Sequence, residues 1–321
     1  MRRSSPILLR LFLLGLLTAW IVQPVSAADR DQLLPAATDA VLTVNVKSLL
    51  SSDVVKKYAE KQIRQDIDKN IGLAITLKAF EFDPFTDLHS ITVAVGVTKP
   101  DKPDVLVIVR GKFDLERLQG VLDQLAKSAP DKGGVSEHGK FKIYQSKEGE
   151  QPGYGCVIDA QTLVLSQNKA LVEKAIDQSQ DKEQVELKKE LQTLLEEVDG
   201  KQTAWLVVAG TEPVKEAVRQ NPDGKAIADK LEGAVAGLTV KDGLRLELTL
   251  VTSDPAAVKT AQEELEKGKQ ALQSAVESLP DYGPILVELL KGVTLTADGG
   301  KFKLRSEVSG EVIERVINKT K

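Results

Sequence analysis

The feature that most constrains the fold is a set of apolar strands joined by tight turns. Residues 238–240 and 244–251 are expected strands on either side of Asp242-Gly243, a strong local signal for a β-hairpin. Asp298-Gly299 is flanked in the same way further along the chain. A tight hairpin places its two strands side by side and antiparallel, whereas parallel strands need a long crossover connection. The sequence therefore predicts antiparallel sheet and argues against a doubly wound parallel sheet.

Amphipathic helices alternate with these strands. Residues 114–125 place four leucines on one face behind a capping Asp114, and residues 254–279 begin with Asp254-Pro255, a typical helix start. Residues 71–80 are ambiguous between a helix and a strand. Each half of the chain is expected to run strand, helix, two strands, helix, strands and a final helix, with one additional strand in the first half.

Local sequence similarity suggests an internal duplication. The segment LVEKAI at 171–176 matches VIERVI at 312–317 at an offset of 141 residues. We expect an α+β fold of two similar halves, each an antiparallel sheet with helices packed on one face in the split strand-helix-strand, ferredoxin-like order. The halves form either two sandwiches or one continuous sheet. The expected units are residues 28–180 and 200–321, joined by a connector helix at 181–199.

The first 27 residues have the pattern of a secretory signal peptide. Three arginines accompany an apolar run at 11–22, and the segment ends in Val25-Ser26-Ala27, with small residues where signal peptidase requires them. The apolar run is shorter than the roughly 20 residues that span a bilayer, which argues against the alternative of an uncleaved anchor. We therefore expect cleavage after Ala27 and a location in the periplasm or outside the cell.

Composition and charge exclude several classes of function. Removing the leader removes three arginines, which changes the formal charge from -4 to -7. This acidity argues against nucleic-acid binding and against docking on anionic lipid by net charge. The single cysteine excludes an intramolecular disulfide, and two histidines leave little for an imidazole metal site. We expect no membrane-spanning segment after cleavage.

Few residues are candidates for chemistry. His89 and His138 are the two imidazoles, and both are expected in surface turns. Cys156 is expected to be a small buried hydrophobe, because no base can be assigned to it. Asp83 and Asp87 flank a short turn and are expected to cap its amides, with a shared hard cation as the alternative. The glycine-rich segments lack the lysine of a phosphate loop, so no catalytic, cofactor or metal residue is assigned.

Two segments carry a family resemblance. Residues 34–45, LPAATDAVLTVN, look like the start of a group of uncharacterised exported bacterial proteins, in which a Leu-Pro-Ala-x-Thr/Asp opening leads into an apolar strand and a helix. Residues 82–88, FDPFTDL, resemble the recurrent Asp-Pro-x-x-Asp-Leu/Ile loop of that group, with Phe82 where a leucine is more usual. The resemblance implies export and α+β modules, and it implies no activity.

The sequence favours an exported, non-catalytic binding or structural protein that needs no cofactor. Its binding surface is expected on the open face of the sheet or on the helix at 255–279, with an envelope or extracellular protein as the partner and no nucleic acid. One alternative is a carboxylate-dependent hydrolase with a pocket lined by Asp83, Asp87 or His89. The other is a carrier of an apolar molecule held between the sheet and the helices.

Overall fold

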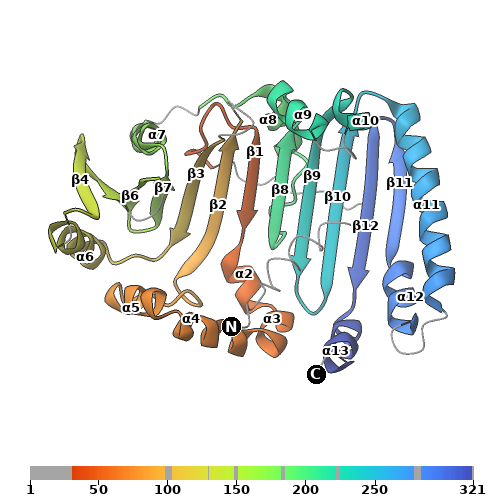
Figure 1. Cartoon of the computed structure of the whole chain (residues 1–321), viewed down its shortest axis with the longest axis horizontal. Coiled ribbons are helices and arrows are strands. Elements are labelled where there is room, and N and C mark those ends of the chain that lie inside the picture. Colours follow the sequence, from red (N-terminus) through yellow and green to blue (C-terminus); the bar gives the residue numbers. More distant parts are fainter. Residues whose placement is uncertain are drawn as a thin grey trace.

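The computed structural model describes residues 31–97, 103–128, 130–147, 151–181, 185–220, 225–277 and 283–319. The predicted leader lies outside these residues. Within them, one large antiparallel sheet extends along the long axis of the molecule, with helices along its borders (Figure 1). The α+β class expected from the sequence is confirmed.

The sheet contains twelve strands, and every neighbouring pair is antiparallel. Its order from one edge to the other is β11-β12-β10-β9-β8-β1-β2-β3-β7-β6-β5-β4. In chain order the strands are β1 (Ala40–Val44), β2 (Leu88–Gly96), β3 (Asp104–Gly111), β4 (Gly133–His138), β5 (Phe141–Ser146), β6 (Gly153–Asp159), β7 (Thr162–Ser166), β8 (Ala204–Ala209), β9 (Leu231–Val240), β10 (Leu244–Thr252), β11 (Val293–Asp298) and β12 (Lys301–Val308).

The helices connect these strands along the ends and faces of the sheet. They are α2 (Val46–Ser51), α3 (Asp53–Tyr58), α4 (Glu60–Lys69), α5 (Ile71–Ala79), α6 (Leu115–Ser128), α7 (Lys169–Gln180), α8 (Lys189–Leu195), α9 (Glu212–Arg219), α10 (Lys225–Ala228), α11 (Pro255–Glu277), α12 (Gly283–Lys291) and α13 (Gly310–Lys319). The ambiguous residues 71–80 are thus helical as α5, and α8 lies within the predicted connector.

The first and second halves of the chain meet at β1 and β8, where Leu42 pairs with Leu206. Outward from this central pair the strands run β2, β3, β7, β6 on one side and β9, β10, β12, β11 on the other. The split, ferredoxin-like order expected for each half is wrong, because β1 pairs directly with β2 in an antiparallel register. The connection between them, α2 to α5, runs along one end of the sheet instead of crossing its face (Figure 1).

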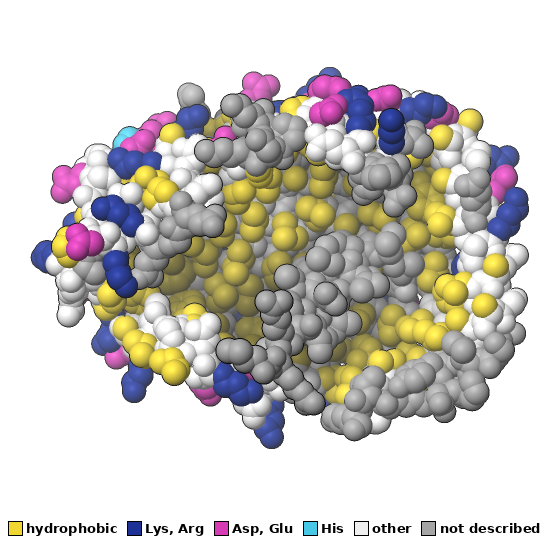
Figure 2. Space-filling model, in the orientation of Figure 1, with side chains coloured by type: hydrophobic (Ala, Val, Ile, Leu, Met, Phe, Trp, Pro, Cys, Tyr) yellow, Lys and Arg dark blue, Asp and Glu magenta, His cyan; other side chains and the backbone are white. Residues whose placement is uncertain are grey.

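Helices pack on both faces of the sheet, which corrects the expectation of a single helical face. On what we call the covered face, Val41, Ile108 and Val164 are fully buried in a core that includes residues of α7 and α8. The opposite face, which we call the open face, contacts α6 at one end and α11 at the other. Between these two helices the open face is hollowed and lined with apolar side chains (Figure 2).

One row of paired residues on the open face crosses all twelve strands, because successive strand registers place these residues side by side. Every member of the row is an aliphatic residue, a glycine or a tyrosine. From β4 to β11 the row is Val135, Tyr144, Gly155, Leu165, Val107, Val93, Leu42, Leu206, Ala236, Leu248, Leu304 and Leu295. Where one face of a sheet meets water, the residues on that face are usually polar. The apolar row therefore indicates that this face contacts apolar material.

Candidate functional site

A cavity of about 870 Å³ lies on the open face, between α6 and the strands from β3 to β4. This volume falls in the range of about 300–1,000 Å³ typical of small-molecule sites. Two of its leucines, Leu125 and Leu165, remain 57% and 45% exposed, so the cavity is open. Its aliphatic lining is contributed by α6, β3 and β7, and includes Val105, Val107, Leu118, Leu122, Leu163 and Leu165.

Glycines contribute to the lining of this cavity. Gly133 and Gly134 lie on β4, and Gly153 and Gly155 lie on β6, and all four line the cavity. A Cβ atom added to Gly155 would stand 2.8 Å from Cδ2 of Leu165, whereas one added to Gly153 would meet nothing within 4 Å. Gly153 therefore leaves open space in the cavity, whereas the space beside Gly155 is already taken by Leu165.

Two hydroxyl groups of the cavity lining, those of Tyr144 and Ser166, are hydrogen-bonded to the protein itself. Tyr144 Oη donates to Asp123 Oδ1 at 2.9 Å, and Lys142 Nζ donates to Asp123 Oδ2 at 2.6 Å. These two hydrogen bonds lower the pKa of the Asp123 carboxyl, while burial and the bond to Asp123 raise the pKa of Tyr144. Ser166 Oγ donates to the Val105 carbonyl at 2.6 Å. A ligand would therefore be held mainly by apolar contact.

The described lining is poorly suited to catalysis. It contains no histidine, aspartate or glutamate. Burial raises the pKa of the Cys156 thiol to about 12, so the thiol stays protonated at neutral pH and is a poor nucleophile. Cys156 is 3% exposed, which confirms the expectation of a small buried residue.

The other candidates from the sequence lie outside the cavity. Asp87 accepts a hydrogen bond from the Asp83 amide at 2.9 Å, and Asp83 accepts one from the Phe85 amide, which is the turn-capping role expected of them. His89 was expected in a surface turn but lies in β2, and its buried Nε2 has no hydrogen-bond partner among the described residues. His138 was expected in a turn but lies in β4, and its Nε2 contacts Asp177 of α7 at 2.7 Å.

The described residues hold no group of three or more His, Cys, Asp or Glu side chains positioned to bind a metal ion. Nor does any helix among them combine the length and apolar character needed to cross a membrane. The cavity and its apolar surroundings are therefore the strongest candidate for a functional site in this part of the chain.

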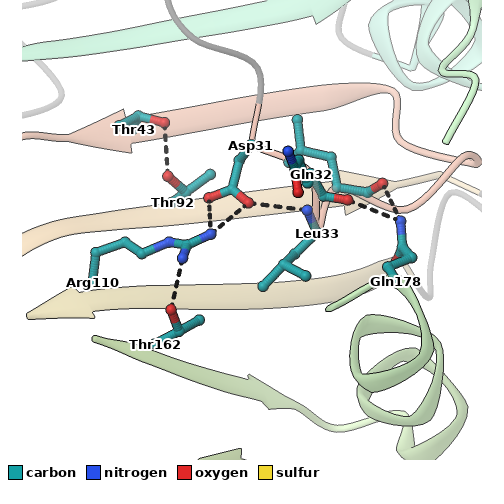
Figure 3. A network of polar contacts seen from close by, with 9 residues as sticks. Asp31, Gln32, Leu33, Thr43, Thr92, Arg110, Thr162 and Gln178 are labelled. Carbon is teal, nitrogen blue, oxygen red and sulfur yellow. Dashed lines mark hydrogen bonds and ion pairs between the residues drawn. The ribbon is translucent and has the colours of Figure 1, made fainter. Parts of the chain in front are cut away.

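The segment that follows the predicted cleavage position is fixed on the covered face (Figure 3). Arg110 donates to both carboxylate oxygens of Asp31, at 2.9 and 3.0 Å, and also to Thr162 Oγ1. Gln178 of α7 donates to the backbone carbonyls of Gln32 and Leu34. This segment adds Leu33 and Leu34 to the core of the covered face, so it stabilises the face opposite the cavity.

A buried carboxylate that the sequence analysis missed connects the two halves. Asp39 is 1% exposed, and its Oδ1 accepts hydrogen bonds from Lys188 Nζ at 2.5 Å and Thr211 Oγ1 at 2.7 Å. Its Oδ2 accepts one from the Val97 amide at 2.7 Å. These partners lie 58 to 172 residues away in the chain. All its bonds are to the protein, so Asp39 has a structural role.

A comparison with known families gives a match over most of the chain. A family model described as a protein of unknown function, DUF3352, matches residues 57–282. The chain belongs to this family. The match contains every residue that lines the cavity, from Phe80 to Gln167. No curated protein and no solved structure matches the chain.

Proposed function

We propose that this DUF3352 protein is an exported, non-catalytic binding protein for a lipid-like molecule, whose apolar part occupies the cavity beneath α6. The observation that carries this proposal is an open cavity of about 870 Å³ with a mainly aliphatic lining, on a sheet face where one row of apolar residues crosses all twelve strands. Exposing such a surface to water is costly, at roughly 25 cal/mol for each Å² of apolar area. An apolar ligand removes that cost.

The distribution of polar groups favours binding over catalysis. Asp83, Asp87 and His89, the residues that would favour a hydrolase, do not line the cavity. The hydroxyls of Tyr144 and Ser166 donate to protein acceptors, so the cavity offers little to a strongly polar substrate. A molecule with an aliphatic chain fits this lining because its contacts need no hydrogen-bond partner.

Export is part of the proposal and rests on the leader pattern at 1–27. The expected product in a bacterial host is a chain that begins at Ala28 and is recovered from the periplasm or the medium. Intact mass and N-terminal sequencing measure this directly. Recovery of the chain from the cytoplasm with its first 27 residues intact would contradict the export part and would leave the cavity unaffected.

The binding part is tested by titrating the exported protein with a fluorescent fatty acid such as cis-parinaric acid. Gly153→Phe is the blocking variant, because its side chain enters the space that the glycine leaves open. We expect wild type to bind the probe saturably and Gly153→Phe to weaken binding at least about tenfold, a change of about 1.4 kcal/mol.

Gly268→Phe is the matched control. It adds the same side chain at an exposed glycine of α11 where an added Cβ also meets nothing within 4 Å. We expect this variant to bind like wild type, with both variants checked for unchanged circular dichroism. Absence of saturable binding by wild type, or equal binding by the folded Gly153→Phe protein, would contradict the proposal.

A further inference from the structure

The helix α5 (Ile71–Ala79) is an apolar element on the surface. Its sequence, IGLAITLKA, contains two polar residues, Thr76 and Lys78. Ile71, Leu73 and Ile75 are 72%, 41% and 64% exposed. Ile71 and Ile75 lie one turn apart on one face of the helix, and Leu73 lies near the opposite face. A helix that is apolar all round is normally buried, and exposed apolar side chains that lie together mark interaction sites. This helix therefore requires an apolar partner that the described residues do not supply.

Local hydrogen bonds satisfy the Thr76 hydroxyl and the Leu73 amide of α5. Thr76 Oγ1 donates to the Gly72 carbonyl at 2.8 Å, and Asn70 caps the helix by accepting from the Leu73 amide at 3.1 Å. An α-helix pairs its interior backbone N–H and C=O groups within itself, so these groups stay hydrogen-bonded in a hydrocarbon environment. Nine residues extend about 14 Å, which is too short to span a bilayer but sufficient for insertion at its surface.

Local charge favours a lipid surface even though the whole chain is acidic. Residues 53–79, which form α3 to α5, contain six basic and four acidic side chains, while the exported chain is expected to carry a formal charge of -7. Three of the basic side chains, Lys57, Arg64 and Lys69, are paired with carboxylates. The basic residues lie on α3 and α4 and near the end of α5, so positive charge accompanies the apolar helix. This arrangement complements anionic headgroups above an acyl layer.

The position of α5 connects this surface to the cavity. Phe80, the residue that follows the helix, lines the cavity. Arg117 of α6 pairs with Glu81 at 2.8 Å and donates to the Ala79 carbonyl at 3.4 Å. Figure 1 places α5 beside α6 at one end of the molecule, and apolar side chains extend along that edge in Figure 2.

We propose that α5 inserts into the surface of a lipid bilayer and places the mouth of the cavity at that surface. A protein partner fits less well, because protein interfaces bury about 800 Å² on each side and are enriched in aromatic residues, which α5 lacks. The delivery of a lipid to the cavity rests on the proposed function, whereas the docking of α5 rests on its own exposed side chains.

The test is flotation of the exported protein with phosphatidylcholine vesicles that contain phosphatidylglycerol. The triple variant Ile71→Ser, Leu73→Ser and Ile75→Ser removes the exposed side chains of α5. We expect it to reduce vesicle binding at least about tenfold, since three aliphatic side chains no longer leave water. Its matched control substitutes serine for three exposed aliphatic residues elsewhere, Ile227, Leu265 and Leu272, and we expect it to float with the vesicles like wild type.

The ligand proposal and the docking proposal can be contradicted independently. The α5 triple variant is expected to retain soluble fatty-acid binding, whereas Gly153→Phe is expected to retain vesicle binding and lose the fatty acid. Equal flotation of wild type and the α5 triple variant, or a wild-type dimer in sedimentation analysis that the α5 substitutions dissociate, would overturn the docking proposal. Normal flotation without fatty-acid binding would leave docking in place and overturn the proposed ligand.

Discussion

The two ends of the open face differ in side-chain packing, although both belong to the same sheet. At the α11 end, Val258 of the helix packs with Leu295, Phe302 and Leu304 of the strands, and all four are buried. At the α6 end, the strands present glycines and half-buried aliphatic residues, and a cavity remains. The fold alone therefore does not produce the cavity. The cavity lies where β4 and β6 carry glycines, among them Gly153, at which an added Cβ would meet nothing within 4 Å.

The largest effect on stability is expected at the α11 end, where the side chains fill the space between helix and sheet. Phe302→Ala removes a buried aromatic side chain from a packed cluster, and the loss of contacts together with the new void is expected to lower the free energy of unfolding by about 3–5 kcal/mol. Urea denaturation followed by circular dichroism measures this change. A loss below about 1 kcal/mol would mean that the α11 end is as loosely packed as the α6 end.

The next effect tests whether the two ends form one cooperative unit. Asp39→Ala removes a carboxylate with three hydrogen-bond donors and leaves Lys188 without this partner. The expected loss in the free energy of unfolding is about 3 kcal/mol. Asp39→Asn is the control, since it keeps an oxygen acceptor and is expected to lose less. Equal stability of Asp39→Ala and wild type would show that this cluster does not hold the halves together.

A smaller effect is expected at the open end. Leu122 lines the cavity on one side, so Leu122→Ala removes a side chain that is already incompletely packed. The expected cost is about 1 kcal/mol, compared with about 2–5 kcal/mol for leucines in filled cores. The same denaturation measurement applies. A loss as large as that of Phe302→Ala would show that the α6 end is packed in solution, against the contrast drawn above.

The smallest effect concerns how α6 is held to the sheet. Asp123 of α6 bonds to Lys142 and Tyr144 of β5, and its pKa is lowered. A carboxyl with a lowered folded-state pKa stabilises the fold above its ordinary pKa of about 4, and this contribution is lost as the pH falls through the folded value.

Asp123→Asn is therefore expected to cost less than about 1 kcal/mol at neutral pH. The difference from wild type is expected to shrink as the pH falls below about 4. Denaturation at several pH values measures this trend. A difference that stays constant with pH would assign the effect to lost contacts and not to the charge of the carboxylate.

Much of the fold could be predicted from the sequence because its signals are local. The turn at Asp242-Gly243 joins β9 to β10, and Asp298-Gly299 joins β11 to β12. Asp114 caps α6 by accepting from the Arg117 amide at 3.0 Å. The strand β4 was missed because its opening glycines, Gly133 and Gly134, are typical of a loop, and its pairing with β5 supplies the structure. The strand structure of β4 therefore depends on its pairing with β5 and not on local residue preference.

The candidate site could not be predicted in the same way. Its two glycine pairs lie about twenty residues apart and come together through the registers of β4, β5 and β6. The short apolar run at α5 has no periodicity that separates a helix from a strand, and its exposure depends on how the chain passes along the end of the sheet. Both features arise from pairings between distant residues.

The central claim is that the α6 end of the open face holds an apolar ligand. Native mass spectrometry of the exported protein, purified without organic solvent and followed by lipid extraction, tests it most directly. We predict a bound amphiphile in wild type and in Gly268→Phe that is lost in Gly153→Phe. Wild-type protein that carries no ligand and takes up none when mixed with lipid vesicles would contradict the claim.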